Sequence, residues 1–247
     1  MRRRLFAAMA VLAGARWLLM AGLVLALLGA FWRVSGQAAD SATVIPAAAL
    51  DSPAPAPAAQ TIVLAGGCFW GVQLVYQHLK GVSSAVSGYA GGSKETASYE
   101  VVSSGRTGHA ESVEVAFDPR QVSLGRILQI FFSVAHDPTE LNRQGPDTGT
   151  QYRSAIFYRD ESQKKIAEAY IAQLDKAGVF RRKIVTQVAP LTGFYPAEAY
   201  HQDYATIHPS MPYIAINDLP KAENLKRLYA DSYRDRPVLV SEAMRSN

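Results

Sequence analysis

The chain has 247 residues, of which 49% are hydrophobic, and carries a formal net charge of +4 at pH 7. This length allows one well-packed domain of about 190 residues once an N-terminal targeting segment is set aside. Basic residues are spread along the sequence, and no stripe of them alternates with aromatic residues, which argues against nucleic-acid binding. With one cysteine and no His-x-x-x-His spacing, the sequence predicts neither an internal disulfide nor a metal site.

The first residues have the pattern of a targeting signal. Residues 2–4 are all arginine, and they precede a largely apolar stretch from Leu5 to Trp32. A basic start before an apolar core is typical of a secretory signal, whereas a membrane-spanning helix needs about 20 apolar residues. Residues 1–36 therefore fit both a cleaved signal peptide and an uncleaved membrane anchor. In a bacterium, either would place the rest of the chain outside the cytoplasm, exported to the periplasm or membrane-anchored.

Residues 37–60 are rich in alanine, proline and serine. This composition is typical of a flexible to semi-extended linker. We therefore predict a tether over residues 37–60 and a single folded domain over residues 61–247.

From residue 61 onward, strand-like and helical patterns alternate without an internal repeat. Apolar runs and alternation predict strands at residues 61–65, 82–87, 110–117, 154–158 and 184–188. Apolar residues at helical spacing predict helices at residues 70–79, 124–132, 166–174 and 222–229. The mixture predicts a layered α+β domain with a central mixed β-sheet flanked by helices, or else an α/β arrangement.

Three long loops interrupt this pattern, at residues 88–98, 137–151 and 194–213. They are rich in glycine, aspartate, asparagine, histidine and tyrosine. Long loops in compact domains are disproportionately functional, so we expect these three to surround a site.

Cys68 is the first candidate for chemistry. It follows the predicted strand 61–65 and the turn Gly66-Gly67, and it precedes the predicted helix. A free cysteine is often an inert, buried residue. At the start of a helix, however, unpaired N–H groups and the helix dipole favour a thiolate, so we predict a nucleophile with an activated, exposed thiol.

Glu111 is the second candidate. In the alternating strand 110–117 it shares a face with Val113, Val115 and Phe117. If that face is the core, burial raises the pKa of Glu111 and makes it a general acid near neutral pH. If Glu111 lies at the mouth of the strand instead, its carboxylate stays hydrated; the sequence leaves both readings open.

Other polar and aromatic residues are weaker candidates. Asp147 and Tyr152 belong to the dense polar segment 142–153, which in isolation reads as a solvated loop. Phe69 and Trp70 would ordinarily be core residues, but at an exposed helix start they could wall an apolar pocket.

Several motifs, taken in order, resemble the peptide methionine sulfoxide reductases of the A class. The resemblance runs from about residue 61 to 229 and rests on six segments: Gly67-Cys68-Phe69-Trp70-Gly71, Gly88-Tyr89-Ala90-Gly91-Gly92, Thr107-Gly108-His109-Ala110-Glu111, His136-Asp137-Pro138-Thr139, Asn142-Arg143-Gln144-Gly145 and Gly149-Thr150-Gln151-Tyr152-Arg153-Ser154. It implies a ferredoxin-like core, and it makes residues 61–247 a catalytic domain that repairs proteins after oxidative stress.

The resemblance also implies a chemistry for the two main candidates. Cys68 would attack the sulfur of methionine-S-sulfoxide, free or in proteins, and become a sulfenic acid while methionine leaves. Glu111 would protonate the sulfoxide oxygen.

The same resemblance implies substrate-binding roles for five more residues. Tyr99 and Tyr152 match the tyrosines that hydrogen-bond the sulfoxide oxygen in the family. Phe69 and Trp70 match the wall around the S-methyl group, and Asp147 matches the acidic residue that helps to position the substrate.

Two departures from the family pattern stand out. Pro146 replaces an asparagine that many relatives have before the aspartate, and the C-terminal resolving cysteines are missing. Because the resolving cysteines are missing, we expect an external thiol, such as that of a thioredoxin-like partner, to regenerate Cys68. We expect no bound cofactor.

Two other functions remain as alternatives. A Cys–His hydrolase would pair Cys68 with His109, His136 or His201, although no spacing favours one of them. A catalytically inactive, membrane-tethered module would bind methionine-rich or oxidised proteins.

Overall fold

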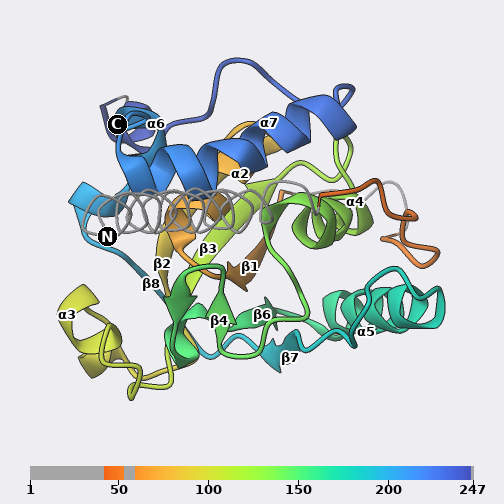
Figure 1. The fold of residues 1–247 in the computed structure, drawn as a ribbon, viewed down its shortest axis with the longest axis horizontal. Helices are drawn as coiled ribbons and strands as arrows, with labels where there is room; N and C mark the ends of the chain where they lie inside the picture. The colour runs from red at the N-terminus through yellow and green to blue at the C-terminus, as the bar shows by residue number, and fades with distance from the viewer. Residues whose placement is uncertain (1–41, 53–58, 246–247) are drawn as a thin grey trace, which may run out of the picture. The chain divides into compact units, whose positions relative to one another are not determined.

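The computed structural model describes residues 42–52 and 59–245, and these residues form one α+β unit around a six-stranded mixed sheet (Figure 1). The strands lie side by side in the order β7 (Gln187–Pro190), β6 (Ser154–Tyr158), β1 (Gln60–Gly66), β3 (Ala110–Phe117), β2 (Val82–Ala90) and β8 (Phe194–Pro196). Only the β6–β7 pair is parallel. This arrangement confirms the predicted mixed sheet and α+β class.

The four central strands have a ferredoxin-like topology. Helix α2 (Phe69–Gln77) connects β1 to β2, and helix α4 (Leu124–Ile130) lies between β3 and β6 in the chain. Together with the antiparallel order β6-β1-β3-β2, this is the split β-α-β of ferredoxin-like domains. The core that the resemblance implied is therefore present.

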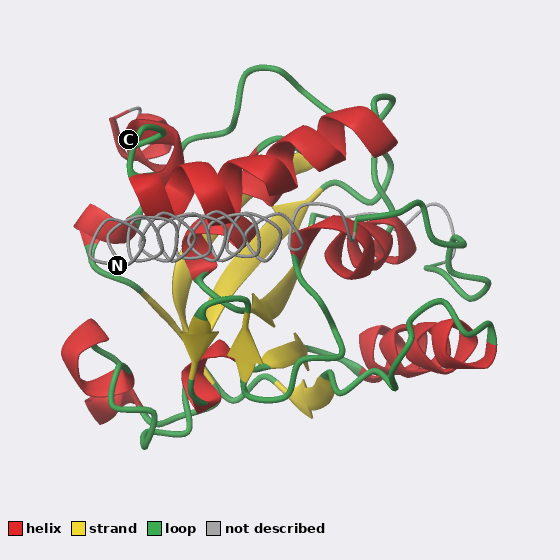
Figure 2. Cartoon of the chain, viewed as in Figure 1, coloured by secondary structure: helices red, strands yellow, loops and turns green. Residues whose placement is uncertain are grey.

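Other helices pack around this core (Figure 2). The longer ones are α5 (Glu161–Lys176) and α7 (Leu219–Leu228), and π-helical turns at Phe131–Ala135 and Ile214–Asp218 extend α4 and precede α7. The short ones are α3 (Tyr99–Val102), α6 (Tyr204–Ile207), α8 (Val240–Arg245) and the 3-10 turns Lys94–Thr96, Thr150–Tyr152 and Ala199–His201. A small hairpin pairs β4 (Arg143–Gln144) with β5 (Asp147–Thr148).

The loops differ from expectation more than the core does. Strand β2 continues to Ala90, because Gly88 to Ala90 pair with β8, a strand that the sequence pattern did not reveal. The strand expected at residues 184–188 lies at 187–190 instead, where it joins β6. The predicted loops at 137–151 and 194–213 therefore contain short strands and helical turns, which fix them in place.

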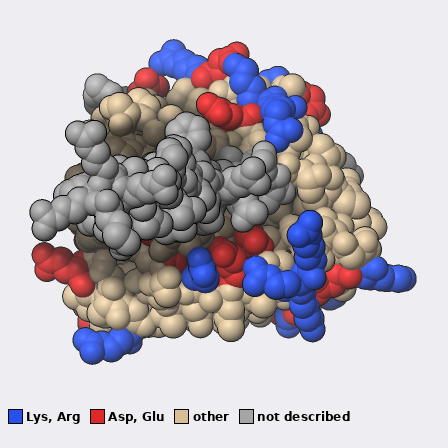
Figure 3. Space-filling model, viewed as in Figure 1, with Lys and Arg blue, Asp and Glu red and all other residues tan. Residues whose placement is uncertain are grey.

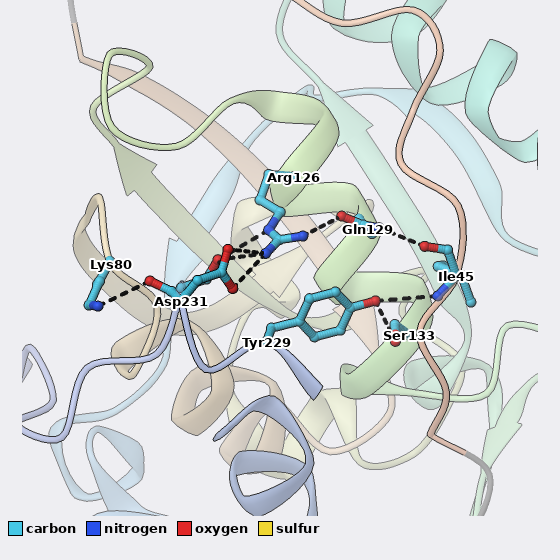
Figure 4. Close-up of polar contacts among 8 residues, drawn as sticks. Ile45, Lys80, Arg126, Gln129, Ser133, Tyr229 and Asp231 are labelled. Atoms are coloured by element: carbon cyan, nitrogen blue, oxygen red, sulfur yellow. Dashed lines mark hydrogen bonds and ion pairs between the residues drawn. The ribbon is translucent and has the colours of Figure 1, made fainter. Parts of the chain in front are cut away.

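The tether prediction is wrong for residues 42–52, which pack on the domain. Ile45 is only 2% exposed and belongs to the main hydrophobic core. Its carbonyl oxygen accepts a hydrogen bond from Nε2 of Gln129 at 2.6 Å (Figure 4). Oη of Tyr229 lies 3.4 Å from the backbone nitrogen of Ile45 and 2.9 Å from Oγ of Ser133. The alanine- and proline-rich composition of this segment indicated a linker, although Ile45 is a core residue.

More hydrogen bonds hold this segment along its length. Oη of Tyr170 donates to the carbonyl of Pro46 at 2.6 Å. The carboxylate of Asp51 accepts from the backbone nitrogen of Gly125 at 2.8 Å, in the first turn of α4. An acidic side chain at a helix N-terminus is stabilising. Residues 42–52 are thus an integral strap of the domain, which we call the N-terminal strap.

Arg126 connects Gln129, which contacts the N-terminal strap, to the C-terminal part of the chain. Its guanidinium donates to Oε1 of Gln129 at 2.8 Å and to the carboxylate of Asp231 at 3.0 Å (Figure 4). The carbonyl of Asp231 in turn accepts from Nζ of Lys80 at 3.0 Å. These contacts connect Lys80, just after α2, to the segment after α7 and to α4, where Gln129 also binds the strap.

Charged residues on the drawn face of the molecule are interspersed (Figure 3). Lysine and arginine side chains lie beside aspartate and glutamate side chains, and those drawn in colour form no single continuous basic patch. Within residues 42–52 and 59–245, no helix has both the length and the apolar character to span a membrane. The segment expected to be a signal or anchor, residues 1–36, lies outside the described residues.

Candidate active site

Cys68 occupies the junction that the sequence predicted. It directly precedes Phe69, the first residue of α2, and follows β1 by one residue, Gly67. Gly67 has a φ of +90°, and a Cβ atom there would lie 2.5 Å from the side chain of Gln144. Glycine is therefore required both for the backbone conformation and for the close approach of the loop at residue 144. The turn places Cys68 at the end of the sheet where β3 also begins.

The protonation state of Cys68 differs from expectation. The side chain is buried, at 8% exposure, and burial together with the charges of Glu111 and Asp218 raises the pKa of the thiol well above its ordinary value. The N–H of Trp70 and the charge of Lys221 lower it, but they are outweighed. The helix start alone therefore does not produce an exposed thiolate, because desolvation penalises the charged form more strongly.

Glu111 lies beside the nucleophile helix. Its side chain is only 4% exposed, and one carboxylate oxygen accepts a hydrogen bond from the backbone nitrogen of Phe69 at 3.1 Å. Burial raises the pKa of Glu111 to about 8, helped by the negative charges of Asp147 and Asp218 and opposed by the Phe69 N–H. Of the two readings left open by the sequence, the structure shows the buried one. Glu111 is therefore a carboxylic acid that still holds its proton at neutral pH.

Tyr99 and Tyr152 approach this pair from two separate loops. Tyr99 begins α3, and Tyr152 ends a 3-10 turn that precedes β6. Burial raises the pKa of both phenols, and the charges of Glu111 and Cys68 raise it further, as expected of neighbours. Both phenols stay protonated at neutral pH and can donate hydrogen bonds, as a binding role for an oxygen atom requires.

Phe69 and Trp70 differ in their surroundings. Phe69 is 1% exposed and packs inside the domain, with its ring centroid 5.0 Å from that of His201. Trp70 is only partly buried and stacks on Tyr204 at 4.0 Å between ring centroids. Its indole nitrogen donates to Nδ1 of His201 at 3.2 Å. Of the two predicted wall residues, Trp70 is thus the one that keeps an exposed edge.

Asp147 is connected to the C-terminal part of the chain. Its carboxylate accepts a hydrogen bond from Oη of Tyr213, whose ring also packs edge-on against Trp70 at 6.1 Å. Burial raises the pKa of Asp147, while the Tyr213 hydroxyl and the charge of Lys221 lower it. Tyr213 lies at the end of the predicted loop 194–213.

Three residues near the site were not among the predicted ones: Tyr213, Asp218 and Lys221. Asp218 is fully buried and pairs with Nζ of Lys221 at 3.1 Å. In the sequence, Tyr213 was marked only as the end of a long loop. Asp218 and Lys221 were marked only as part of the Asp-Leu-Pro-Lys segment at the start of α7. Neither signal points to Cys68, since the contact forms only in the folded chain.

The histidines do not support the hydrolase alternative. His136 bonds the carbonyl of Phe131 and Oγ of Ser154, and burial lowers its pKa to about 4. His109 bonds the backbone of residues 92 and 93, and His201 accepts from Trp70. Among the described residues, no hydrogen bond joins a histidine to Cys68, and no group of three or more potential ligands is placed to hold a metal ion.

Comparisons with known proteins agree with this geometry. The family model described as peptide methionine sulfoxide reductase matches residues 60–233. The chain is 59% identical to peptide methionine sulfoxide reductase MsrA 2 of Mesorhizobium japonicum over 188 residues, which cover 76% of this chain and 96% of that protein. It is 49% identical to MsrA 2 of Synechocystis over 172 residues, covering 70% and 80%.

Solved structures agree as well. Reduced Mxr1 of Saccharomyces cerevisiae has a TM-score of 0.56 at 33% identity, covering 68% of this chain and 94% of its own. Methionine sulfoxide reductase A of Corynebacterium diphtheriae has a TM-score of 0.52 at 37% identity, covering 68% and 83%. The chain therefore belongs to the peptide methionine sulfoxide reductase family, in its A class.

Proposed function

We propose that Cys68 is the nucleophile with which this enzyme reduces methionine-S-sulfoxide, free or in proteins. As a member of the family, the chain is a methionine sulfoxide reductase. The observation that best supports the assignment of residues is the contact between Glu111 and the start of α2. It brings a protonated carboxyl group next to the cysteine-bearing turn.

The first step transfers one oxygen atom. As the thiol of Cys68 gives up its proton, its sulfur attacks the sulfoxide sulfur and forms an S–S bond. This bond and the sulfoxide S–O bond then break, the oxygen ends on Cys68 as a sulfenic acid, and methionine leaves. The sulfoxide is reduced to methionine, and the thiol is oxidised. The oxygen takes its proton from Glu111 and the thiol proton of Cys68 replaces it on the carboxyl group, so the overall step neither consumes nor releases a proton.

Glu111 makes the oxygen a better leaving group by donating its proton as the S–O bond breaks. A general acid is most effective when its pKa lies near the working pH, and the pKa of about 8 meets this condition. The thiol proton of Cys68 then restores the acid. The two groups therefore work as a coupled pair. The coupling matters because the thiol of Cys68 holds its proton tightly and would not ionise alone.

The remaining predicted residues position the substrate. Tyr99 and Tyr152 donate hydrogen bonds to the sulfoxide oxygen, and Trp70 contacts the S-methyl group with Phe69 behind it. Asp147 accepts a hydrogen bond from the substrate, with Tyr213 holding its carboxylate. The proximity of these groups to Cys68 and Glu111 supports the assignment.

A second molecule returns Cys68 to the thiol. The chain contains no other cysteine, so one external thiol condenses with the sulfenic acid, releases water and leaves a mixed disulfide. A second thiol then displaces Cys68 and completes the cycle. A dithiol reductant of the thioredoxin type supplies both thiols from one partner, and no bound cofactor takes part.

We also propose that the enzyme works outside the cytoplasm, as an exported or membrane-anchored protein. The arginines at residues 2–4 and the apolar stretch after them support this proposal. The N-terminal residue of the protein purified separately from membrane and soluble fractions decides between anchor and cleaved peptide. A single cytoplasmic pool that retains Met1 would contradict both.

The activity assay uses dithiothreitol as the reductant and follows methionine formed from each sulfoxide epimer. We expect turnover of the S epimer by the natural protein, none of the R epimer, and no turnover by Cys68→Ala. Equal use of both epimers, or activity that survives Cys68→Ala, would overturn the proposed function.

A further inference from the structure

A pair of opposite charges, the buried Asp218 and the partly buried Lys221, lies against the first turn of α2. A Cβ atom built on Gly71, three residues after Cys68, would lie 2.1 Å from Oδ1 of Asp218 and 2.6 Å from Nζ of Lys221. Glycine at this position therefore gives both charged groups direct access to the backbone of the nucleophile helix. The pair reaches that turn from the start of α7, far away in the sequence.

Asp218 is an unusual residue for this place. It is fully buried, and its Oδ2 atom has no hydrogen-bond partner among the described residues. Although it precedes α7, its side chain makes no capping hydrogen bond to that helix. A buried ion pair is weak support for stability, because desolvation offsets the attraction between the charges. Neither helix capping nor net stabilisation therefore accounts for a carboxylate here.

We propose that Asp218 and Lys221 are positioning residues whose charges set how tightly Cys68 and Glu111 hold their protons. The effect of these charges on catalysis rests on the proposed function, whereas their effect on the protons of Cys68 and Glu111 does not. Negative charge close to an acid and a thiol favours their protonated forms, and a partly compensating ammonium limits this effect. Asp218 would thereby keep the resting thiol uncharged and keep the proton on the acid.

The electrostatic effects at the site agree with this role. The charge of Asp218 raises the pKa of both Cys68 and Glu111, and at Cys68 it acts more strongly than the opposing charge of Lys221. Burial raises the pKa of Asp218 itself, whereas the charge and hydrogen bond of Lys221 lower it and favour the charged form. Lys221 also lowers the pKa of Asp147. The other groups that share these interactions with Cys68 are Glu111 on β3, Tyr99 on α3, Tyr152 after β5, and Tyr213 before α7.

The decisive variant is Asp218→Asn, which keeps the shape of the side chain and removes its charge. Because the chain has one cysteine, iodoacetamide labels only Cys68, and the pH dependence of labelling reports its pKa directly. We expect Asp218→Asn to react about threefold or more faster than the natural protein at neutral pH, as removal of one nearby negative charge requires. In the reductase assay, the alkaline loss of activity should move to lower pH, since Glu111 also loses its proton more easily.

A second variant separates charge from structure. Asp218→Asn/Lys221→Met removes both charges, so it also tests the proposal if Asp218→Asn alone does not fold. We expect the double variant to be labelled faster than the natural protein but more slowly than Asp218→Asn, because the favourable ammonium is gone. Labelling that is unchanged or slower in the variants that fold would overturn the proposal.

Labelling needs no sulfoxide, so it can succeed or fail independently of the proposed function. If the natural protein reduces no sulfoxide while labelling responds as expected, the proposed function fails and the electrostatic role stands. The reverse result, reduction by the natural protein with no response of labelling to Asp218→Asn, overturns only the electrostatic role.

Discussion

The backbone N–H of Phe69 donates a hydrogen bond to the carboxyl group of Glu111 at 3.1 Å. This contact joins the residue that follows the nucleophile to the proposed general acid. It fixes the carboxyl group beside the turn that carries Cys68, and the surrounding burial keeps the proton on it.

Glu111→Gln removes the acid but retains the shape of the side chain. We expect single-turnover reduction of methionine-S-sulfoxide to fall by about 10²–10⁴-fold, the usual contribution of a general acid. The matched control is Glu114→Gln on the same strand, whose carboxylate pairs with Arg159 away from the site. Equal rates for Glu111→Gln and the natural protein would remove the acid from the mechanism.

The pH profile of that single turnover tests the same group in another way. The pKa of Glu111 is about 8, so the protonated acid is available below that pH and is lost as the pH rises through it. The rate should therefore decline on the alkaline side near pH 8, even though rising pH forms more Cys68 thiolate. Glu111→Gln should lack this decline; a decline that persists in the variant would come from another group.

Tyr213→Phe removes the hydroxyl that donates to Asp147. A hydrogen bond to a charged group is worth about 1.5–3 kcal/mol, so we expect kcat/KM for a methionine sulfoxide peptide to fall by about 10- to 100-fold. Because that bond lowers the pKa of Asp147, the acid side of the profile should move to higher pH. Tyr233→Phe is the control, since Tyr233 stacks on His78 at the other end of α2. An unaltered profile in Tyr213→Phe would show that Asp147 works without this bond.

The N-terminal strap is testable through stability. Ile45→Ala deletes a core side chain and should reduce the free energy of unfolding by about 2–5 kcal/mol, measured by urea denaturation. Val44→Ala, at a neighbouring position that is 60% exposed, should change it by less than about 0.5 kcal/mol. If the two variants are equally stable, the strap does not pack on the domain as described.

The parts of this protein that local sequence patterns encode were predictable. The period of two in strand 110–117 placed Glu111 on one face with Val113, Val115 and Phe117, although it left the burial of the carboxyl group open, and Gly66-Gly67 marked the turn before Cys68. The central strands and α2 follow from the same periodicity, because each buries a continuous apolar face. Six motifs in order then identified the family, which periodicity alone could not do.

What escaped prediction depends on contacts between distant segments. The proton affinity of Cys68 depends on Asp218, which reaches it only through the packing of α7 on α2. Strand β8 is a three-residue edge strand with no apolar alternation, so its pairing with β2 is invisible in the sequence. Ile45 lies among alanines and prolines, where composition indicates a linker, and only its burial shows that the segment is folded.

A single turnover without any reducing agent shows whether Cys68 itself takes the oxygen from the sulfoxide. Reduced protein is mixed with excess methionine-S-sulfoxide; the methionine formed is counted, and the oxidised site is located by mass spectrometry after trapping with dimedone. We predict one equivalent of methionine per chain and one dimedone adduct, on Cys68. Methionine formed without modification of Cys68, or continued turnover in the absence of a thiol, would contradict the account.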